Sequence, residues 1–119
     1  MRNDDNTTIA ELKRQVLDLC RRKGWGIDGV QNPQHVAMAM TVEMSELLAH
    51  FQWLDPEDVE RLQAGGDPER QAMIAEEFAD VMMYGLQLAS TLGIDVTTQI
   101  LRKIAIVELR PPKDQQPHH

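Results

Sequence analysis

The sequence predicts an all-α protein with a four-helix bundle-like fold and one additional short connector helix. Apolar residues recur at intervals of three and four along most of the chain, which is the spacing of one helix face. An asparagine or aspartate stands directly before a proline at positions 32, 55 and 67, and this pair is typical of a helix N-terminus. Apolar alternation is absent and aromatic residues make up only 4% of the chain, so no strand is expected.

The first two helices are expected on either side of a glycine-rich break. Thr8 and Glu11 match a capping box in front of a helix that should run to about Lys23. Three glycines between positions 24 and 29 then interrupt the helical pattern. Asn32-Pro33 begins the second helix, which should end near Asp55-Pro56, because a residue before proline is pushed out of the helical region.

Three further helices are expected in the second half of the chain. The segment from Pro56 to about Gln63 should form the connector helix. Asp67-Pro68 begins the most strongly helical run, which continues to Leu92 and is closed by a glycine. A last helix capped by Asp95 should end before Pro111-Pro112.

Size and charge limit the possible functions. The 119 residues and 13.5 kDa fit a single helical domain at 1–112 followed by a flexible tail at 113–119. The formal net charge of −7 opposes binding to nucleic acid or to an anionic membrane surface. The lone Cys20 cannot form a disulfide within the chain, and its place in an apolar pattern favours a buried small side chain. With no apolar stretch long enough for a signal sequence or a membrane span, a soluble cytoplasmic protein is expected.

The helix expected from Asp67 to Leu92 is apolar on most of its sides. Such a helix needs neighbours on most sides, and a chain of this size offers few. A homodimer or homotetramer built on these helices is therefore expected.

Four acidic residues form two pairs at helical spacing. Glu43 and Glu46 lie on one face of the second helix, and Glu77 and Asp80 on one face of the long helix. One such pair alone is typical of a solvated face, but in an antiparallel hairpin these two pairs come level. Four converging carboxylates repel one another, and a divalent cation such as Mg²⁺, Mn²⁺ or Ca²⁺ removes the conflict. A di-iron bundle site is not favoured, since neither pair is a Glu-x-x-His motif.

The acidic pairs and their surroundings resemble the all-α nucleoside triphosphate pyrophosphohydrolases of the MazG-like superfamily, and most of all the dCTP pyrophosphatase branch. The resemblance runs from about Thr8 to Pro112 and is densest in NPQHVAMAMTVEMSELLAHFQWL and EEFADVMMYGLQLASTLGID. It implies a MazG fold and an Mg²⁺-dependent enzyme, with Mn²⁺ as a substitute. The implied reaction is attack of water on the α-phosphorus of a nucleoside triphosphate, which releases the monophosphate and pyrophosphate.

The resemblance also implies roles for individual residues. The metal ligands would be Glu43, Glu46, Glu77 and Asp80, and Glu46 is the preferred candidate for the catalytic base. Two tryptophans match the nucleotide pocket, where an indole can stack on a base, and a lysine of the last helix faces phosphate in that family. The substrate-binding positions are Trp53, Trp25, Lys103, His35 and Tyr84.

The chain departs from the family pattern where the base and sugar would be recognised. His35 and Val107 stand where members often carry asparagine, and Pro111 replaces a tyrosine. The expected substrate is dCTP or a modified pyrimidine nucleotide, and the expected role is sanitation of the nucleotide pool. Two alternatives remain open: a nucleotide-binding regulatory module without turnover, and a helical oligomerisation domain without a ligand.

Overall fold

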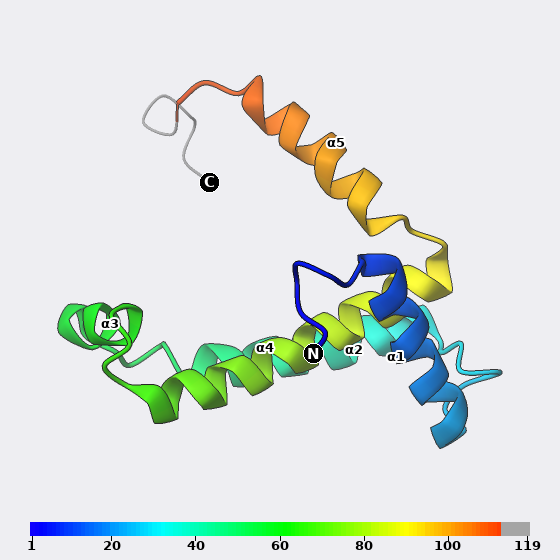
Figure 1. Cartoon of the computed structure of the whole chain (residues 1–119), viewed down its shortest axis with the longest axis horizontal. Coiled ribbons are helices and arrows are strands. Elements are labelled where there is room, and N and C mark those ends of the chain that lie inside the picture. The colour runs from blue at the N-terminus through cyan, green and yellow to red at the C-terminus, as the bar shows by residue number, and fades with distance from the viewer. Residues whose placement is uncertain (113–119) are drawn as a thin grey trace.

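The computed structural model describes residues 1–112, and this part of the chain is helical with no strand, only an isolated bridge between Ile27 and Val30 (Figure 1). The all-α prediction is therefore confirmed. The tail predicted at 113–119 lies outside the described residues. None of the helices in the described range is both long and apolar enough to cross a membrane. The helices are α1 (Ile9–Lys23), α2 (Pro33–Ala49), α3 (Pro56–Gln63), α4 (Pro68–Leu92) and α5 (Val96–Glu108).

Helices α2 and α4 form an antiparallel pair that runs the length of the body (Figure 1). At one end the Arg70 guanidinium, in the first turn of α4, donates a hydrogen bond of 3.1 Å to the carbonyl of His50 just after α2. At the other end the Thr91 hydroxyl, in the last turn of α4, donates one of 2.9 Å to the carbonyl of Gln31 just before α2. Side chains on the facing sides of the two helices are thereby held level.

Helix α1 crosses one end of this pair, and the buried core lies there. Cys20 is 1% exposed, as its apolar context predicted, and accepts a weak hydrogen bond from the Gln31 amide at 3.6 Å. The other buried apolar residues come from the start of α2 and the second half of α4. They are Val36, Val81, Leu86 and Ala89.

The predicted end of α2 is wrong. The helix ends at Ala49 and not near Asp55, and turns occupy positions 50–53. The backbone N–H groups of His50 and Phe51 donate to carbonyls only three residues earlier, and bonds of this kind tighten and close a helix. The turns then lead into α3, which Asp55 caps from the extended conformation expected of a residue before proline.

The caps predicted from sequence are present, with one difference. The Thr8 hydroxyl accepts a hydrogen bond from the Glu11 N–H at 3.1 Å, but the Glu11 carboxylate faces Arg14 at 3.7 Å and does not complete the box. A full capping box forms instead between Asp55 and Asp58. Asp-capped helices therefore start where the sequence places them, because the cap bonds join residues only three apart.

Helix α5 stands apart from the other helices, and Figure 1 shows it projecting away from the α2–α4 pair. Residues 97–112 are all exposed. The four long helices thus do not close a bundle within one chain. The radius of gyration of 17.3 Å reflects this shape, since a compact chain of this length would have about 13.5 Å.

Candidate metal centre

The centre lies where α2 and α4 approach closely. Gly85 faces Met40, and a Cβ built on this glycine would lie 3.5 Å from the Met40 methyl carbon. About one turn away from this contact come Glu43 on α2 and Asp80 on α4. The antiparallel register predicted from the sequence therefore brings carboxylates of the two helices to the same level.

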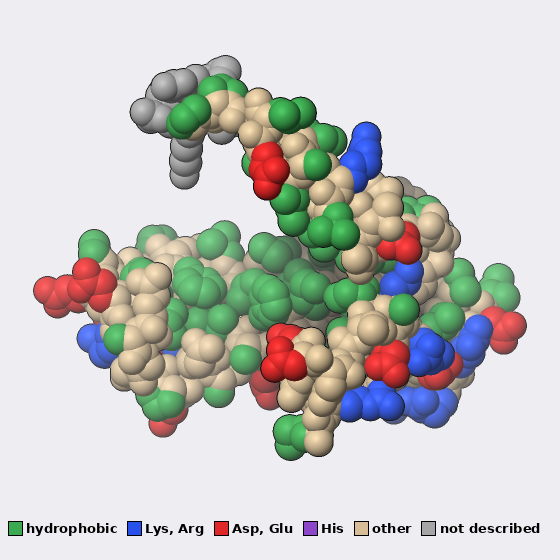
Figure 2. Space-filling model, turned by 45° about the horizontal axis from the view of Figure 1, so that its top comes forward, with side chains coloured by type: hydrophobic (Ala, Val, Ile, Leu, Met, Phe, Trp, Pro, Cys, Tyr) green, Lys and Arg blue, Asp and Glu red, His purple; other side chains and the backbone are tan. Residues whose placement is uncertain are grey.

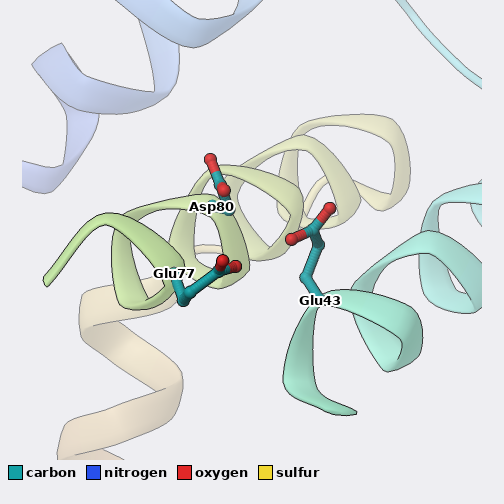
Figure 3. Close-up of side chains that lie close together, drawn as sticks. All are labelled: Glu43, Glu77 and Asp80. Atoms are coloured by element: carbon teal, nitrogen blue, oxygen red, sulfur yellow. The ribbon is translucent and has the colours of Figure 1, made fainter. Parts of the chain in front are cut away.

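Three of the four predicted metal ligands converge. Glu43, Glu77 and Asp80 each offer a carboxylate oxygen, and these three oxygens all lie within 4.8 Å of one another. Figure 3 shows Glu43 reaching from α2 towards the two side chains of α4. Atoms this close, from two helices, can share one small cation.

Two of these carboxylates have buried oxygens that lack hydrogen-bond partners among residues 1–112. Oε2 of Glu43 and Oε2 of Glu77 are both inaccessible, although each residue as a whole is only half-buried, and Asp80 is exposed. A buried acceptor without a partner costs free energy, more so when it is charged. The ion pairs among the described residues all join residues three apart in the chain and include none of these carboxylates. A bound cation would satisfy both oxygens, and an all-carboxylate donor set suits Mg²⁺, Mn²⁺ or Ca²⁺.

The electrostatics of Glu43 reflect the same crowding. Burial is the largest cause that raises the pKa of Glu43 above its ordinary value of 4.5. The charge of Glu46 and a hydrogen bond with that residue come next, followed by the charges of Asp80 and Glu77. The three neighbouring carboxylates therefore all act on Glu43, which holds a proton more tightly than a lone glutamate would.

Glu46 differs from the other three predicted ligands. It does not belong to the group of oxygens within 4.8 Å, and like Asp80 it is exposed. Its effect on the pKa of Glu43 nevertheless places it beside the centre. An exposed carboxylate next to three converging ones is accessible to water.

The predicted substrate-binding residues are spread over the molecule. Tyr84 is half-buried on α4, one turn beyond Asp80. Trp53 is 86% exposed in the turn after α2, and Trp25 is 45% exposed in the loop after α1. Lys103 is exposed on α5, away from the body.

His35 lies in the first turn of α2 and lines an open depression of about 520 Å³. The loop before α2 provides its other walls. These are formed by Gly26, Ile27, Val30, Gln31 and Asn32. The sequence-based prediction missed this depression, because its shape depends on how the loop folds back.

A tight turn shapes this loop. Asp28 and Gly29 both have positive φ, 56° and 80°, as in a type I′ turn, and Ile27 and Val30 exchange backbone hydrogen bonds of 3.0 and 2.9 Å across it. The Asp-Gly dipeptide was the signal for this turn. Gln31 follows it and donates a hydrogen bond of 2.6 Å to Gln87 of α4, which fixes the loop against the body.

Comparisons with known proteins identify the family of this chain. The sequence profile of the MazG-like family matches residues 38–115. Among curated proteins, dCTP pyrophosphatase 1 of Homo sapiens is 28% identical over 105 residues, which cover 88% of this chain and 59% of the relative. The protein of the same name from Rattus norvegicus is 25% identical over the same shares, and that from Bos taurus is 26% identical over 88% and 60%. The chain thus spans about three-fifths of the length of the curated relatives it matches.

Proposed function

This chain belongs to the MazG-like family, and we propose that it is a metal-dependent nucleoside triphosphate pyrophosphohydrolase. The observation that carries the proposal is the convergence of Glu43, Glu77 and Asp80, whose oxygens lie within 4.8 Å of one another. Phosphoryl chemistry needs charge to be neutralised on the phosphate oxygens and a water molecule to be placed in line. A carboxylate centre of this kind can supply both.

The proposed cofactor is Mg²⁺, with Mn²⁺ as a substitute, held by Glu43, Glu77 and Asp80. Support comes from the buried Oε2 atoms of Glu43 and Glu77, which have no other partner among residues 1–112. When bound, such an ion neutralises negative charge on the triphosphate and makes the α-phosphorus easier to attack. Glu43 binds a metal ion as the carboxylate, and because its pKa is raised, protons compete with the ion for this ligand.

Glu46 is the proposed general base. It is exposed and stands outside the three-oxygen group, so one of its oxygens can accept a hydrogen bond from water. The water oxygen would bond to the α-phosphorus, and its proton would pass to Glu46. The bond from this phosphorus to the oxygen bridging to the β-phosphorus would break, and pyrophosphate would leave with that oxygen.

The proposed substrate class is dCTP or a modified pyrimidine nucleotide. The relatives named above are dCTP pyrophosphatases, although this chain covers only 59% of their length. Trp53 and Trp25 have exposed indole faces on which a base can stack. His35 and Tyr84 are the other proposed contacts to the nucleotide, and the proposed place of action is the cytoplasmic nucleotide pool.

The test is a screen of canonical and modified deoxynucleoside triphosphates with Mg²⁺, read as release of pyrophosphate. We expect turnover of at least one pyrimidine nucleotide, and its loss in Glu46→Gln. Turnover that survives both Glu46→Gln and Asp80→Asn would contradict the mechanism. Binding of a triphosphate in calorimetry without product would instead indicate a regulatory module.

We also propose that the active form is a homo-oligomer, either a dimer or a tetramer. Large apolar side chains on α4 stay exposed in the single chain, among them Met73 at 47%, Phe78 at 55% and Met82 at 43%. A second copy would cover this surface. An assembly without any effect of Mg²⁺ or Mn²⁺ on thermal stability would favour a helical oligomerisation domain over an enzyme.

A further inference from the structure

One face of α4 carries five polar side chains in a row. Glu77 and Asp80 of the metal centre come first, and Tyr84 follows one turn later. Gln87 and Thr91 continue the same stripe, because residues three and four apart lie on one face of a helix. The proposed function involves the first three residues of this stripe but not the last two.

Gln87 and Thr91 both bind Gln31, which lies in the loop between α1 and α2. The Gln31 side-chain amide donates a hydrogen bond of 2.6 Å to Oε1 of Gln87 and a weak one of 3.6 Å to the Cys20 thiol. The Thr91 hydroxyl donates a hydrogen bond of 2.9 Å to the Gln31 backbone carbonyl. Gln31 is therefore held to α4 through both its side chain and its backbone.

The same loop, residues 24–32, is also fixed to α1. The Arg21 side chain donates a hydrogen bond of 3.1 Å to the Asp28 carbonyl. Gly29 packs so closely on α1 that a Cβ at this position would lie 2.9 Å from the Leu17 carbonyl oxygen. Connecting loops are usually the mobile parts of a protein, whereas this one is held by contacts to two helices.

This loop borders two of the proposed contacts to the nucleoside. Trp25 lies at its start, where the Trp25 N–H donates a hydrogen bond of 2.9 Å to the Cys20 carbonyl and the side chain is 45% exposed. Gln31, near its end, lines the depression of about 520 Å³ beside His35. The position of Gln31 therefore sets the shape of this depression.

The distance from the metal centre to this loop suits a nucleotide. Gln87 comes seven residues after Asp80, which is about 10 Å along α4. His35 comes eight residues before Glu43, which is about 12 Å along α2. These lengths are close to the span from the α-phosphorus of a nucleoside triphosphate to the far edge of its base. A substrate with its phosphates at the carboxylates can thus place its base at this loop.

We propose that Gln87 and Thr91 are positioning residues, which act through Gln31 and hold the loop at residues 24–32 in the conformation that binds the nucleoside. A preorganised loop binds with a smaller loss of conformational entropy than a loop that must first be ordered. This inference rests on the proposed function, because it assumes a nucleotide with its phosphates at the carboxylate centre.

Steady-state kinetics of Gln87→Leu with the preferred triphosphate tests this role. The leucine has no acceptor for the Gln31 amide, so KM should rise by about 5- to 10-fold. The value of kcat should stay within about twofold, because the loop contributes equally to binding of the substrate and the transition state. Gln71→Leu, near the exposed start of α4, is the matched control and should change neither constant. An unchanged KM in Gln87→Leu, or a loss of kcat alone, overturns the positioning role.

Inorganic triphosphate separates the two ends of the substrate. It carries the phosphates without a nucleoside, so its inhibition constant should agree within about twofold between the wild type and Gln87→Leu. A rise of this constant equal to the rise of KM would mean that Gln87 supports the metal centre or the whole fold. That result would overturn a role confined to the nucleoside end.

Thr91 allows a test by conservative replacement. Thr91→Val removes the hydroxyl at nearly constant size and should raise KM several-fold, whereas Thr91→Ser keeps the donor and should retain the wild-type KM. Combining Thr91→Val with Gln87→Leu should add little to the larger single effect, because both changes free the same loop. Equal KM values for the valine and serine variants would contradict the role of Thr91.

The state of the loop can also be measured without turnover. Trp53→Phe leaves Trp25 as the single tryptophan of the chain, so its fluorescence reports on the loop. In this background, acrylamide should quench Trp25 more strongly when Gln87→Leu is added, because a freed loop exposes the indole more often. Unchanged quenching would overturn the proposal that Gln87 holds the loop.

The outcomes separate this inference from the proposed function. A wild-type chain that hydrolyses no triphosphate contradicts the proposed function and this inference with it, and that result is known before any variant is made. An active wild type whose KM is unchanged in Gln87→Leu overturns the positioning role alone.

Discussion

Helices α4 and α5 follow one another in the chain, yet their apolar residues end in opposite surroundings. Helix α4 buries Val81, Leu86 and Ala89 against its neighbours, whereas no residue of α5 is buried. Both helices have aspartate caps and apolar stripes at helical spacing. The difference shows that such a stripe predicts a helix but not the surface it packs on. The proposed site residues divide in the same way, since Glu43, Glu77 and Asp80 lie on the packed helices and Lys103 lies on the unpacked one. Figure 2 shows α5 standing clear of the body, with hydrophobic side chains on both.

The largest expected effect concerns the packed side of this comparison. Glu77→Gln removes one of the three converging oxygens and leaves the helix intact, so pyrophosphate release should fall by about 10³-fold. Glu69→Gln, in the exposed first turn of the same helix, is the control and should retain wild-type turnover. Equal losses in both variants would mean that net charge matters and the centre does not.

The second effect contrasts the two helices in stability. Leu86→Ala leaves a cavity in the core and should lower the free energy of unfolding by about 3 kcal/mol. Ile104→Ala on α5 should change it by less than about 0.5 kcal/mol in dilute, monomeric protein, because the side chain is half exposed and unpacked. Denaturant titration at low concentration measures both. Similar losses in the two variants would show that α5 packs within its own chain.

Local signals account for the parts of the fold that the sequence predicted well. The starts of α3, α4 and α5 agree with prediction because an aspartate side chain bonds a backbone N–H three residues later, with or without tertiary structure. The end of α2 at Ala49 was missed because it depends on how the chain turns towards α3. The separation of α5 was not predictable for a related reason, since what covers a helix is not encoded in its own pattern.

The candidate site also has features that the sequence predicts and features that depend on tertiary structure. Spacing on two helices was enough to predict that Glu43, Glu77 and Asp80 converge, because helix geometry and an antiparallel register are regular. The position of Glu46 outside the three-oxygen group depends on side-chain directions that spacing does not give. Its role as base, and the metal itself, stay predictions. The depression beside His35 depends on the Asp28-Gly29 turn, whose signal was present in the sequence but was not used.

The third effect is stabilisation by metal, which should act on the body. Mg²⁺ at about a hundredfold excess over its Kd would add about 2.7 kcal/mol and raise the melting temperature by several degrees. Glu43→Gln should remove this shift, and Glu69→Gln should preserve it. Thermal unfolding with Mg²⁺ and with a chelator makes the comparison. The absence of any shift in the wild type would contradict a metal centre.

The same shift should depend on pH in a defined direction. The pKa of Glu43 is raised above 4.5 in the metal-free protein. Its contribution to folding stability is therefore fully present below pH 4.5 and is lost as the pH rises through the raised pKa. Protons and Mg²⁺ compete for the same oxygens, so stabilisation by Mg²⁺ should be larger near about pH 7.5 than near about pH 5. A shift that does not vary with pH would place the ion elsewhere.

The smallest effect tests the two helices through identical cap chemistry. Asp67 caps α4 and Asp95 caps α5, and each side chain accepts a hydrogen bond from the backbone N–H three residues later. In both residues this hydrogen bond is the largest cause that lowers the pKa of the carboxyl group below 3.8. Asp67→Ala should lower the melting temperature of the whole body by a few degrees. Asp95→Ala should instead reduce the helix signal in circular dichroism of the dilute monomer and leave that temperature unchanged, since α5 can melt alone.

Low pH offers a second way to compare the caps of α4 and α5. The pKa of each cap is lower in the folded protein than the value of 3.8 expected in the unfolded chain. Both caps therefore stabilise the fold above pH 3.8, and this stabilisation is lost as the pH falls through the lowered pKa. Acidification of the dilute monomer through this range should therefore melt α5 before it unfolds the body. At concentrations where copies assemble, α5 would be covered and the two losses should merge into one transition. Separate transitions in the assembled protein would mean that α5 remains uncovered in the proposed homo-oligomer.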